Sequence, residues 1–240
     1  MVQSSHQHLD LYARVEHLLG IEEATYKLHQ VYIDLLDEYK INSNDIKSVL
    51  DLGCGRGLLI EKLLEKKVEA SGIDLSGVMV NDAKAKNLEV QLIDIADYHD
   101  KKFDAIVAVF DVLNFISPTE INEFLNAVSD SLNDGGYFIA DVNSLHGFSD
   151  VAEGVMSVDM EDSFLNIDAI FDENILRTTF TLFEKKSEKE GDSFTKDQDE
   201  ILQYFHPMKL FRQQKSLKLI KNYAVSLYDE DDKTLLIFKK

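Results

Sequence analysis

The chain is poor in cysteine, proline and basic residues. Its 240 residues include one Cys, two Pro and no Trp. With Cys54 as its single thiol, the chain cannot form an internal disulfide or a cysteine-based zinc cluster. Its 25 Lys and Arg stand against 44 Asp and Glu, which gives a formal net charge of -19. Such a charge repels polyphosphates at long range, so it argues against DNA, RNA or an anionic membrane as a partner.

Long apolar runs are also missing. No segment approaches the length of a membrane span. Residues 1–11 lack the basic flank and apolar core of a signal peptide, so we expect a cytoplasmic protein. Hydrophobic residues nonetheless make up 45% of the chain, which is enough for a packed core in one α/β domain with a modest elaboration.

The spacing of apolar residues changes along the chain. From residue 9 to about residue 39 it is helical, and Gly20 separates two predicted helices. Short apolar strands then alternate with helices, which is typical of a parallel sheet covered on both faces. The predicted strands are 48–52, 70–75, 90–93, 103–110 and 137–142, with helices at 58–66, 78–86 and 119–132 and a turn at 133–136.

After about residue 145 the composition changes. Segments 163–170, 175–184 and 200–205 are rich in Phe, Ile and Thr, and we predict antiparallel strands inserted after the fifth core strand. Residues 207–220 are predicted to be helical, and 223–228 and 233–239 to form a terminal antiparallel pair. The predicted division is helices plus an α/β core at 1–145, an inserted antiparallel β lid at 146–206, and a return helix with terminal strands at 207–240.

A glycine-rich turn follows the first predicted strand. Gly53, Gly55 and Gly57 alternate before the next helix, so a ligand can approach the backbone where side chains would otherwise block it. A nicotinamide dinucleotide site favours G-x-G-x-x-G, but Leu58 stands at its third glycine position here. Asp51 precedes the loop, and a carboxylate there suits a cationic amine better than a pyrophosphate. The pattern disfavours a nucleotide-dependent oxidoreductase.

This loop resembles the first motif of the class I S-adenosylmethionine-dependent methyltransferases. That motif, acid-x-Gly-x-Gly-x-Gly, is matched without departure by Asp51, Gly53, Gly55 and Gly57. In that family the acid helps to orient the methionine ammonium of the cofactor, and the loop backbone cradles the cofactor. The resemblance covers residues 48–143 and implies a doubly wound, Rossmann-like sheet of seven mostly parallel strands. It also implies S-adenosyl-L-methionine as cofactor and S-adenosyl-L-homocysteine as product.

Two further acids follow predicted strands, as in that family. Asp74 ends the second strand, where the family's acid holds both ribose hydroxyls, and Ser76 is better placed than Asp74 to cap the next helix. Asp94 follows the third strand near the expected adenine, and Asp97 competes for this role. The resemblance implies cofactor-binding roles for Asp51, Gly53, Cys54, Gly55, Gly57, Asp74, Leu75, Asp94, Ile95 and Phe110.

The segments after the fourth and fifth strands resemble the small-molecule branch of that family. Phe110 and Asp111 are expected at the boundary between cofactor and acceptor. Asp111 either attracts a substrate amine or, with Asn114, organises the turn. Asn143 follows the fifth strand and can face the acceptor, and His146 is either a general base or a surface histidine. Asp111, Asn143 and His146 are thus the candidate catalytic residues, and no metal site is predicted.

The sequence therefore predicts methyl transfer from S-adenosylmethionine to a small-molecule acceptor, for which the resemblance suggests an amine. The sulfonium is already activated, so the protein mainly aligns the partners for in-line displacement and excludes water. The inserted β segment is similar to the sheet that covers the active site in sugar-amine and glycine-type N-methyltransferases. The alternative is a non-catalytic binding or interaction module on the same fold. We expect no nucleic-acid or membrane partner, and the sequence does not indicate the oligomeric state.

Overall fold

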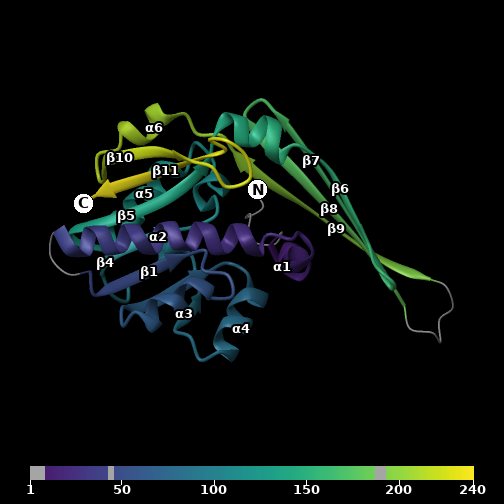
Figure 1. Ribbon diagram of the computed structural model, residues 1–240, viewed down its shortest axis with the longest axis horizontal. Helices are drawn as coiled ribbons and strands as arrows, with labels where there is room; N and C mark the ends of the chain where they lie inside the picture. The colour runs from purple at the N-terminus through teal and green to yellow at the C-terminus, as the bar shows by residue number, and fades with distance from the viewer. Residues whose placement is uncertain (1–8, 43–45, 187–192) are drawn as a thin grey trace.

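Two sheets organise the chain (Figure 1). The structure, a computed structural model, describes residues 9–42, 46–186 and 193–240. The larger sheet has seven strands in the order β10-β11-β5-β4-β1-β2-β3, and a separate four-stranded sheet has the order β6-β7-β8-β9. The predicted fold class, a mostly parallel α/β sheet with an added antiparallel β segment, is confirmed.

Five parallel strands, each joined to the next by a crossover connection, form the larger sheet from β5 to β3. Beyond β5, β11 pairs antiparallel with β5, and β10 pairs antiparallel with β11. The parallel strands are β1 (Ser48–Leu52), β2 (Glu69–Asp74), β3 (Val90–Leu92), β4 (Phe103–Ala108) and β5 (Leu132–Asn143), and the added strands are β10 (Lys218–Val225) and β11 (Lys233–Lys239).

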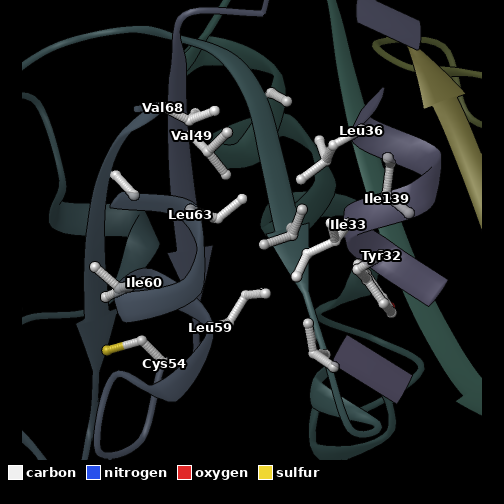
Figure 2. Close-up of a cluster of buried hydrophobic side chains, with 14 of the residues drawn as sticks. Tyr32, Ile33, Leu36, Val49, Cys54, Leu59, Ile60, Leu63, Val68 and Ile139 are labelled. Atoms are coloured by element: carbon white, nitrogen blue, oxygen red, sulfur yellow. The ribbon is translucent and has the colours of Figure 1, made fainter. Parts of the chain in front are cut away.

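Helices cover both faces of this sheet. On one face α2 (Glu22–Asn42), α3 (Leu58–Glu65) and α4 (Gly77–Ala85) pack on alternate strand residues such as Val49 and Ile139 (Figure 2). On the other face α5 (Ile121–Asp130) and α6 (Met208–Arg212) pack on the intervening residues, such as Leu50 and Phe138. Burial on both faces explains why these strands are almost continuously apolar in the sequence.

Two boundaries predicted from the sequence are wrong. The predicted turn at 133–136 lies inside β5, where Gly135 has a φ of 80° and the register with β4 shifts. The predicted helix at 207–220 ends at Arg212, and β10 begins at Lys218 because Leu219 pairs with Phe238 of β11. The register shift leaves residues 133–136 outside the pairing with β4. At the second place, pairing with β11 overrides the local helix signal.

The smaller sheet is antiparallel throughout and packs one face on the N-terminal helix α1 (Leu9–Val15). Leu11 and Val15 of α1 contact Leu165 and Phe180 of the sheet, whose far end extends away from the helices (Figure 1). The first of its strands was not predicted, and the last begins earlier than predicted. Its strands are β6 (Gly154–Asp159), β7 (Ser163–Asp172), β8 (Ile175–Lys185) and β9 (Phe194–Tyr204).

Short helical turns connect several of these elements. They are η2 (Glu16–Leu18), η3 (Ile95–Asp97), η4 (Val112–Phe115) and the π-helical turn η5 (Gly147–Ala152). The described part of the chain contains no helix that is both long and apolar enough to span a bilayer.

Candidate functional site

The loop between β1 and α3 adopts a backbone that requires glycine. Gly53, Gly55 and Gly57 have φ values of 68°, 52° and 75°, in the left-handed region. A Cβ on Gly57 would lie 2.3 Å from Cδ1 of Leu88, and one on Gly53 would lie 2.8 Å from Cγ2 of Val112. The nearest atom to a Cβ on Gly55 is 3.9 Å away. A side chain at either outer position would have to displace Leu88 or Val112, and the positive φ disfavours residues other than glycine there, whereas Gly55 has open space beside its backbone.

Asp51 is a buried carboxylate at the end of β1. It is 3% exposed, and no described residue donates a hydrogen bond or supplies a cation to it. Burial raises the pKa of Asp51 well above its ordinary value, and repulsion from Asp74 raises it further. A buried carboxylate without a partner is costly, and a ligand ammonium beside it would remove much of that cost. Asp51 therefore fits the methionine ammonium of S-adenosylmethionine.

Asp74 braces the glycine loop from the end of β2. Its Oδ2 accepts a hydrogen bond from the Gly55 N–H at 2.8 Å, and its Oδ1 accepts one from the Ser76 N–H at 2.8 Å. Burial raises the pKa of Asp74, although these backbone hydrogen bonds lower it. Each oxygen keeps one lone pair, so the carboxylate can still accept two hydroxyls. Ser76 caps α4 by accepting from Met79, as the sequence predicts.

Three other predicted cofactor-binding residues, Asp94, Ile95 and Cys54, differ in which of their atoms a ligand can reach. Asp94 caps η3 by accepting from the Ala96 N–H at 2.8 Å, and the side chain of Ile95 is buried beneath α5. Only the backbone of Ile95 is therefore available to a ligand. The Cys54 side chain packs against Ile60 and Gly72, and burial raises the pKa of its thiol. It is a packing residue within the loop, not a nucleophile. The adenine contact of Asp94 stays a prediction.

Phe110 and Asp111 form an unusual backbone segment after β4. Both have a φ of 63°, in the left-handed region that side chains other than glycine rarely adopt. The Asp141 carboxylate holds them in place: Oδ1 accepts from the Phe110 N–H at 2.9 Å, and Oδ2 from the Asp111 N–H at 3.2 Å. Such strain persists where the surroundings enforce it, often at functional sites.

A lysine that the sequence analysis missed completes this cluster. The Lys233 ammonium, at the start of β11, contacts Oδ1 of Asp111, lies 3.0 Å from Oδ1 of Asn143 and lies 3.4 Å from Oδ2 of Asp141. A signal was available: Lys233 shares its side of the strand with the buried Leu235 and Ile237. A lysine in register with core residues needs buried anionic partners.

Helix α2 supplies the last member of the cluster. The Tyr32 hydroxyl lies 2.7 Å from Oδ1 of Asp141 and 2.9 Å from the carbonyl oxygen of Ala108. Its single proton serves one of these acceptors at a time. Burial, followed by the charge of Asp141, raises the pKa of Tyr32 well above its ordinary value. The phenol thus stays neutral and acts as a donor.

Asn143 and Asn114 organise the surrounding turn. The Asn143 amide donates to Oδ2 of Asp111 at 3.1 Å, and its backbone N–H donates to Oδ1 of Asn114 at 2.9 Å. The Asn114 amide donates to the carbonyl oxygen of Tyr204 at 2.8 Å, which ties η4 to the end of β9. The side chain of Asn143 therefore contacts Asp111, and a direct contact with the acceptor stays a prediction.

His146 lies apart from this cluster, among surface carboxylates. Its Nδ1 is 3.1 Å from Oδ2 of Asp150, and its Nε2 is 3.1 Å from Oδ2 of Asp229. These contacts raise the pKa of His146, first through Asp150. A ring that donates to two carboxylates has no free acceptor nitrogen, so its geometry favours the surface interpretation over the general base.

Helix α1 is fastened beside the glycine loop. Arg56, within that loop, contacts Glu16, lies 2.9 Å from Asp82 and donates to the carbonyl oxygen of Ala13 at 2.8 Å. Tyr12 of the same helix is half-buried, and its pKa is raised to about 12, first by burial and then by charges that include Asp111. The N-terminal helix thus brings a neutral phenol near the Asp111 carboxylate.

His29 gives this region a testable pH dependence. It lies on α2, edge-on to Phe110, and burial lowers its pKa from 6.5 to about 4. Below pH 6.5 the unfolded chain binds a proton that the folded chain does not, so stability falls as the pH drops toward 4. We expect this residue to account for a loss of about 2 kcal/mol at pH 5 relative to pH 7.5.

Urea unfolding at the two pH values measures this loss. His29→Leu is expected to reduce the difference by that amount, whereas the exposed His99→Gln leaves it unchanged. An equal difference for wild type and His29→Leu contradicts a neutral buried His29. The buried carboxylates contribute with the opposite sign, but all three proteins share them.

Comparison with known proteins agrees with this geometry. Residues 49–136 match the methyltransferase domain family. "Putative methyltransferase YqeM" of Bacillus subtilis is 32% identical over 112 residues, which cover 43% of this chain and 45% of that protein. A dTDP-3-amino-3,4,6-trideoxy-alpha-D-glucopyranose N,N-dimethyltransferase of Streptomyces venezuelae is 24% identical over 112 residues, 45% of this chain and 47% of that protein. The chain spans about half the length of the curated relatives it matches.

Solved structures share the whole fold at low sequence identity. An S-adenosylmethionine-dependent methyltransferase from Clostridium acetobutylicum has a TM-score of 0.75 and 22% identity, with 95% of this chain and 98% of that chain covered. The sugar N-methyltransferase KedS8 from Streptoalloteichus has a TM-score of 0.71 and 16% identity, with 96% and 92% covered. Residues 49–136 therefore match a methyltransferase domain, and the chain has the fold of these methyltransferases.

Proposed function

We propose that this chain binds S-adenosyl-L-methionine at the carboxyl ends of β1, β2 and β3 and transfers its methyl group to a small-molecule acceptor. The observation that carries the proposal is Asp51, a buried carboxylate without a partner among the described residues, directly before an open glycine loop. Asp51 would take the methionine ammonium and Asp74 the ribose hydroxyls. Asp94 and the Ile95 backbone would lie at the adenine.

The bound cofactor would supply an electrophilic methyl group. The residues of this chain then have to hold the acceptor in line with that methyl group and keep water away. Phe110 and Asp111 suit this task, because Asp141 fixes their backbone next to the glycine loop. A rigid segment aligns an acceptor at low entropic cost, and little further catalysis is needed for an activated sulfonium.

For the acceptor atom we propose an amine nitrogen. Asp111, Asp141 and Lys233 together carry two negative charges and one positive charge, so their sum is one negative charge at neutral pH. That sum favours an approaching ammonium over an anionic acceptor. The amine must lose a proton before it attacks, since only the neutral nitrogen has a free electron pair. Relatives and neighbours named as sugar N-methyltransferases support this choice.

Isothermal titration with S-adenosylmethionine, with NAD as the control ligand, tests the proposal. We expect micromolar affinity for S-adenosylmethionine and none for NAD. Transfer of a labelled methyl group from the cofactor to amino sugars and amino acids, with the matching hydroxy compounds as controls, then tests the acceptor. The absence of cofactor binding rejects the proposal. Binding without transfer to any acceptor favours the alternative, a non-catalytic binding module.

A further inference from the structure

Lys233 is a buried cation to which the proposed reaction assigns no task. It lies 122 residues from Asp111 in the sequence, yet its ammonium contacts Oδ1 of Asp111 and lies 3.4 Å from Oδ2 of Asp141. Its side chain is 1% exposed. Placing an ammonium at such depth is expensive, and the two carboxylates and the Asn143 oxygen compensate for its lost hydration.

The three charged groups differ in their exposure to solvent. The Asp141 side chain is 0% exposed and that of Lys233 is 1%, whereas the Asp111 side chain is 15% exposed. Asp111 is therefore the member that a ligand can touch. Lys233 and Asp141 act on a ligand only through Asp111, because they lie behind it.

Lys233 favours the ionised form of Asp111. Both carboxylates lie against the same Lys233 ammonium, which contacts Oδ1 of Asp111 and lies 3.4 Å from Oδ2 of Asp141. Burial raises the pKa of Asp111, the Lys233 ammonium lowers it, and the charge of Asp141 raises it again. The Lys233 ammonium also fixes one oxygen of Asp111 while Asn143 fixes the other.

We propose that Lys233 is a positioning residue that keeps Asp111 ionised and fixed toward a cationic partner, either the cofactor sulfonium or the ammonium of an acceptor amine. The inference rests on the proposed function, since it needs the cofactor to bind beside Asp111. It adds a requirement beyond Asp51, the glycine loop and Asp74. The site also needs an anion at Asp111, and Lys233 of β11 maintains its charge.

The surroundings of Asp111 define its titration. Burial raises the pKa of Asp111 to about 6, and the nearby Lys233 ammonium limits the rise. Asp141 faces it from β5 and raises its pKa. Among the described residues, three phenols also interact with Asp111, and their raised pKa values keep them neutral over this pH range: Tyr12 on α1, Tyr32 on α2 and Tyr228 before β11. His29 on α2 lies edge-on to Phe110 and interacts with the charge of Asp141, and burial lowers its pKa to about 4. Without Lys233, Asp111 should take up its proton at a higher pH.

The ratio of two dissociation constants tests this proposal without an acceptor. S-adenosylmethionine carries a sulfonium and S-adenosylhomocysteine a neutral sulfur, and their other groups are shared, so the ratio reports charge beside the sulfur. We expect the wild-type preference for S-adenosylmethionine, measured by titration from pH 5 to 8.5, to fall as the pH drops through about 6. Asp111→Asn should lower the preference about three- to tenfold at pH 8 and abolish its pH dependence.

Lys233→Met is the decisive variant. We expect the pH at which the preference falls to rise by at least one unit, while Asp111→Asn/Lys233→Met shows no such transition. A purely structural role of Lys233 would lower the affinity for both ligands equally and leave the transition where it is in wild type. An unchanged transition in Lys233→Met therefore overturns the inference. Failure of wild type to bind S-adenosylmethionine rejects the proposed function instead.

A second measurement applies if Lys233→Met does not fold. In wild-type protein labelled with ¹³C at the lysine Cε, one lysine resonance should shift near pH 6, as Asp111 beside it titrates. The same step should be missing from Asp111→Asn. A wild-type spectrum in which no lysine senses a titration near pH 6 also overturns the inference.

Discussion

Asp51→Asn is expected to weaken S-adenosylmethionine binding about 100-fold and, at the same time, to stabilise the free protein. The loss of affinity follows from replacing a buried charge-assisted hydrogen bond to an ammonium with a neutral one, which corresponds to about 2–3 kcal/mol. Asp51 is 3% exposed and faces no cation among the described residues, so no described side chain would compete with the ligand ammonium for its carboxylate.

The gain in stability comes from the removal of a buried charge that has no partner among the described residues of the free protein. Burial and the charge of Asp74 raise the pKa of Asp51, so the folded chain binds this proton more tightly than the unfolded chain does. Stability is therefore lost as the pH rises above the unfolded pKa of Asp51, so the ionised carboxylate destabilises the folded state at neutral pH. Removal of the charge should increase the free energy of unfolding by about 1–2 kcal/mol.

Titration calorimetry and urea unfolding of the same preparations measure both effects. Asp134→Asn is the matched control, because it removes a carboxylate whose side chain is fully exposed, and it should change neither quantity. Equal cofactor affinity in wild type and Asp51→Asn contradicts the assignment of the site. A loss of both affinity and stability would instead identify Asp51 as a structural residue.

The proposed cofactor half of the site is the half that the sequence indicates, because its signals are local. Asp51, the three glycines and Asp74 each lie within a few residues of a strand end, and parallel strands place their carboxyl ends along one edge. A βα unit brings such residues together whatever the rest of the chain does. The left-handed φ values at Gly53, Gly55 and Gly57 explain why this pattern is recognisable in a single sequence.

The proposed acceptor half could not be predicted in the same way. Tyr32, Asp111, Asp141 and Lys233 come from α2, the segment after β4, β5 and β11, and they meet through pairings across most of the chain. The antiparallel register that places Lys233 opposite Asn143 depends on β11 entering the sheet between β10 and β5. The alternation of Lys233 with Leu235 and Ile237 indicates a buried lysine, but no spacing in the sequence identifies Asp111 and Asp141 as its partners.

Asp141→Asn is expected to cause the largest loss of stability, about 3–5 kcal/mol. Asp141 is 0% exposed and accepts from the Tyr32 hydroxyl and from the N–H groups of Phe110 and Asp111, beside the Lys233 ammonium. An amide at this position cannot accept on both sides, so one terminal NH₂ would face existing donors. Lys233 would also lose one of its two anions.

A smaller change in the same cluster provides the comparison. Tyr32→Phe removes one donor and leaves all three charged groups of the cluster in place, so it should cost only about 1 kcal/mol. Urea unfolding at pH 7.5 should therefore rank wild type first, Tyr32→Phe second and Asp141→Asn last. Thermal unfolding of Asp141→Asn should begin roughly 10 °C lower than that of wild type. If both variants lose the same small amount, Asp141 is not the anchor of the strained segment, and the left-handed backbone at Phe110 and Asp111 must be held by the packing of Val112 on the glycine loop.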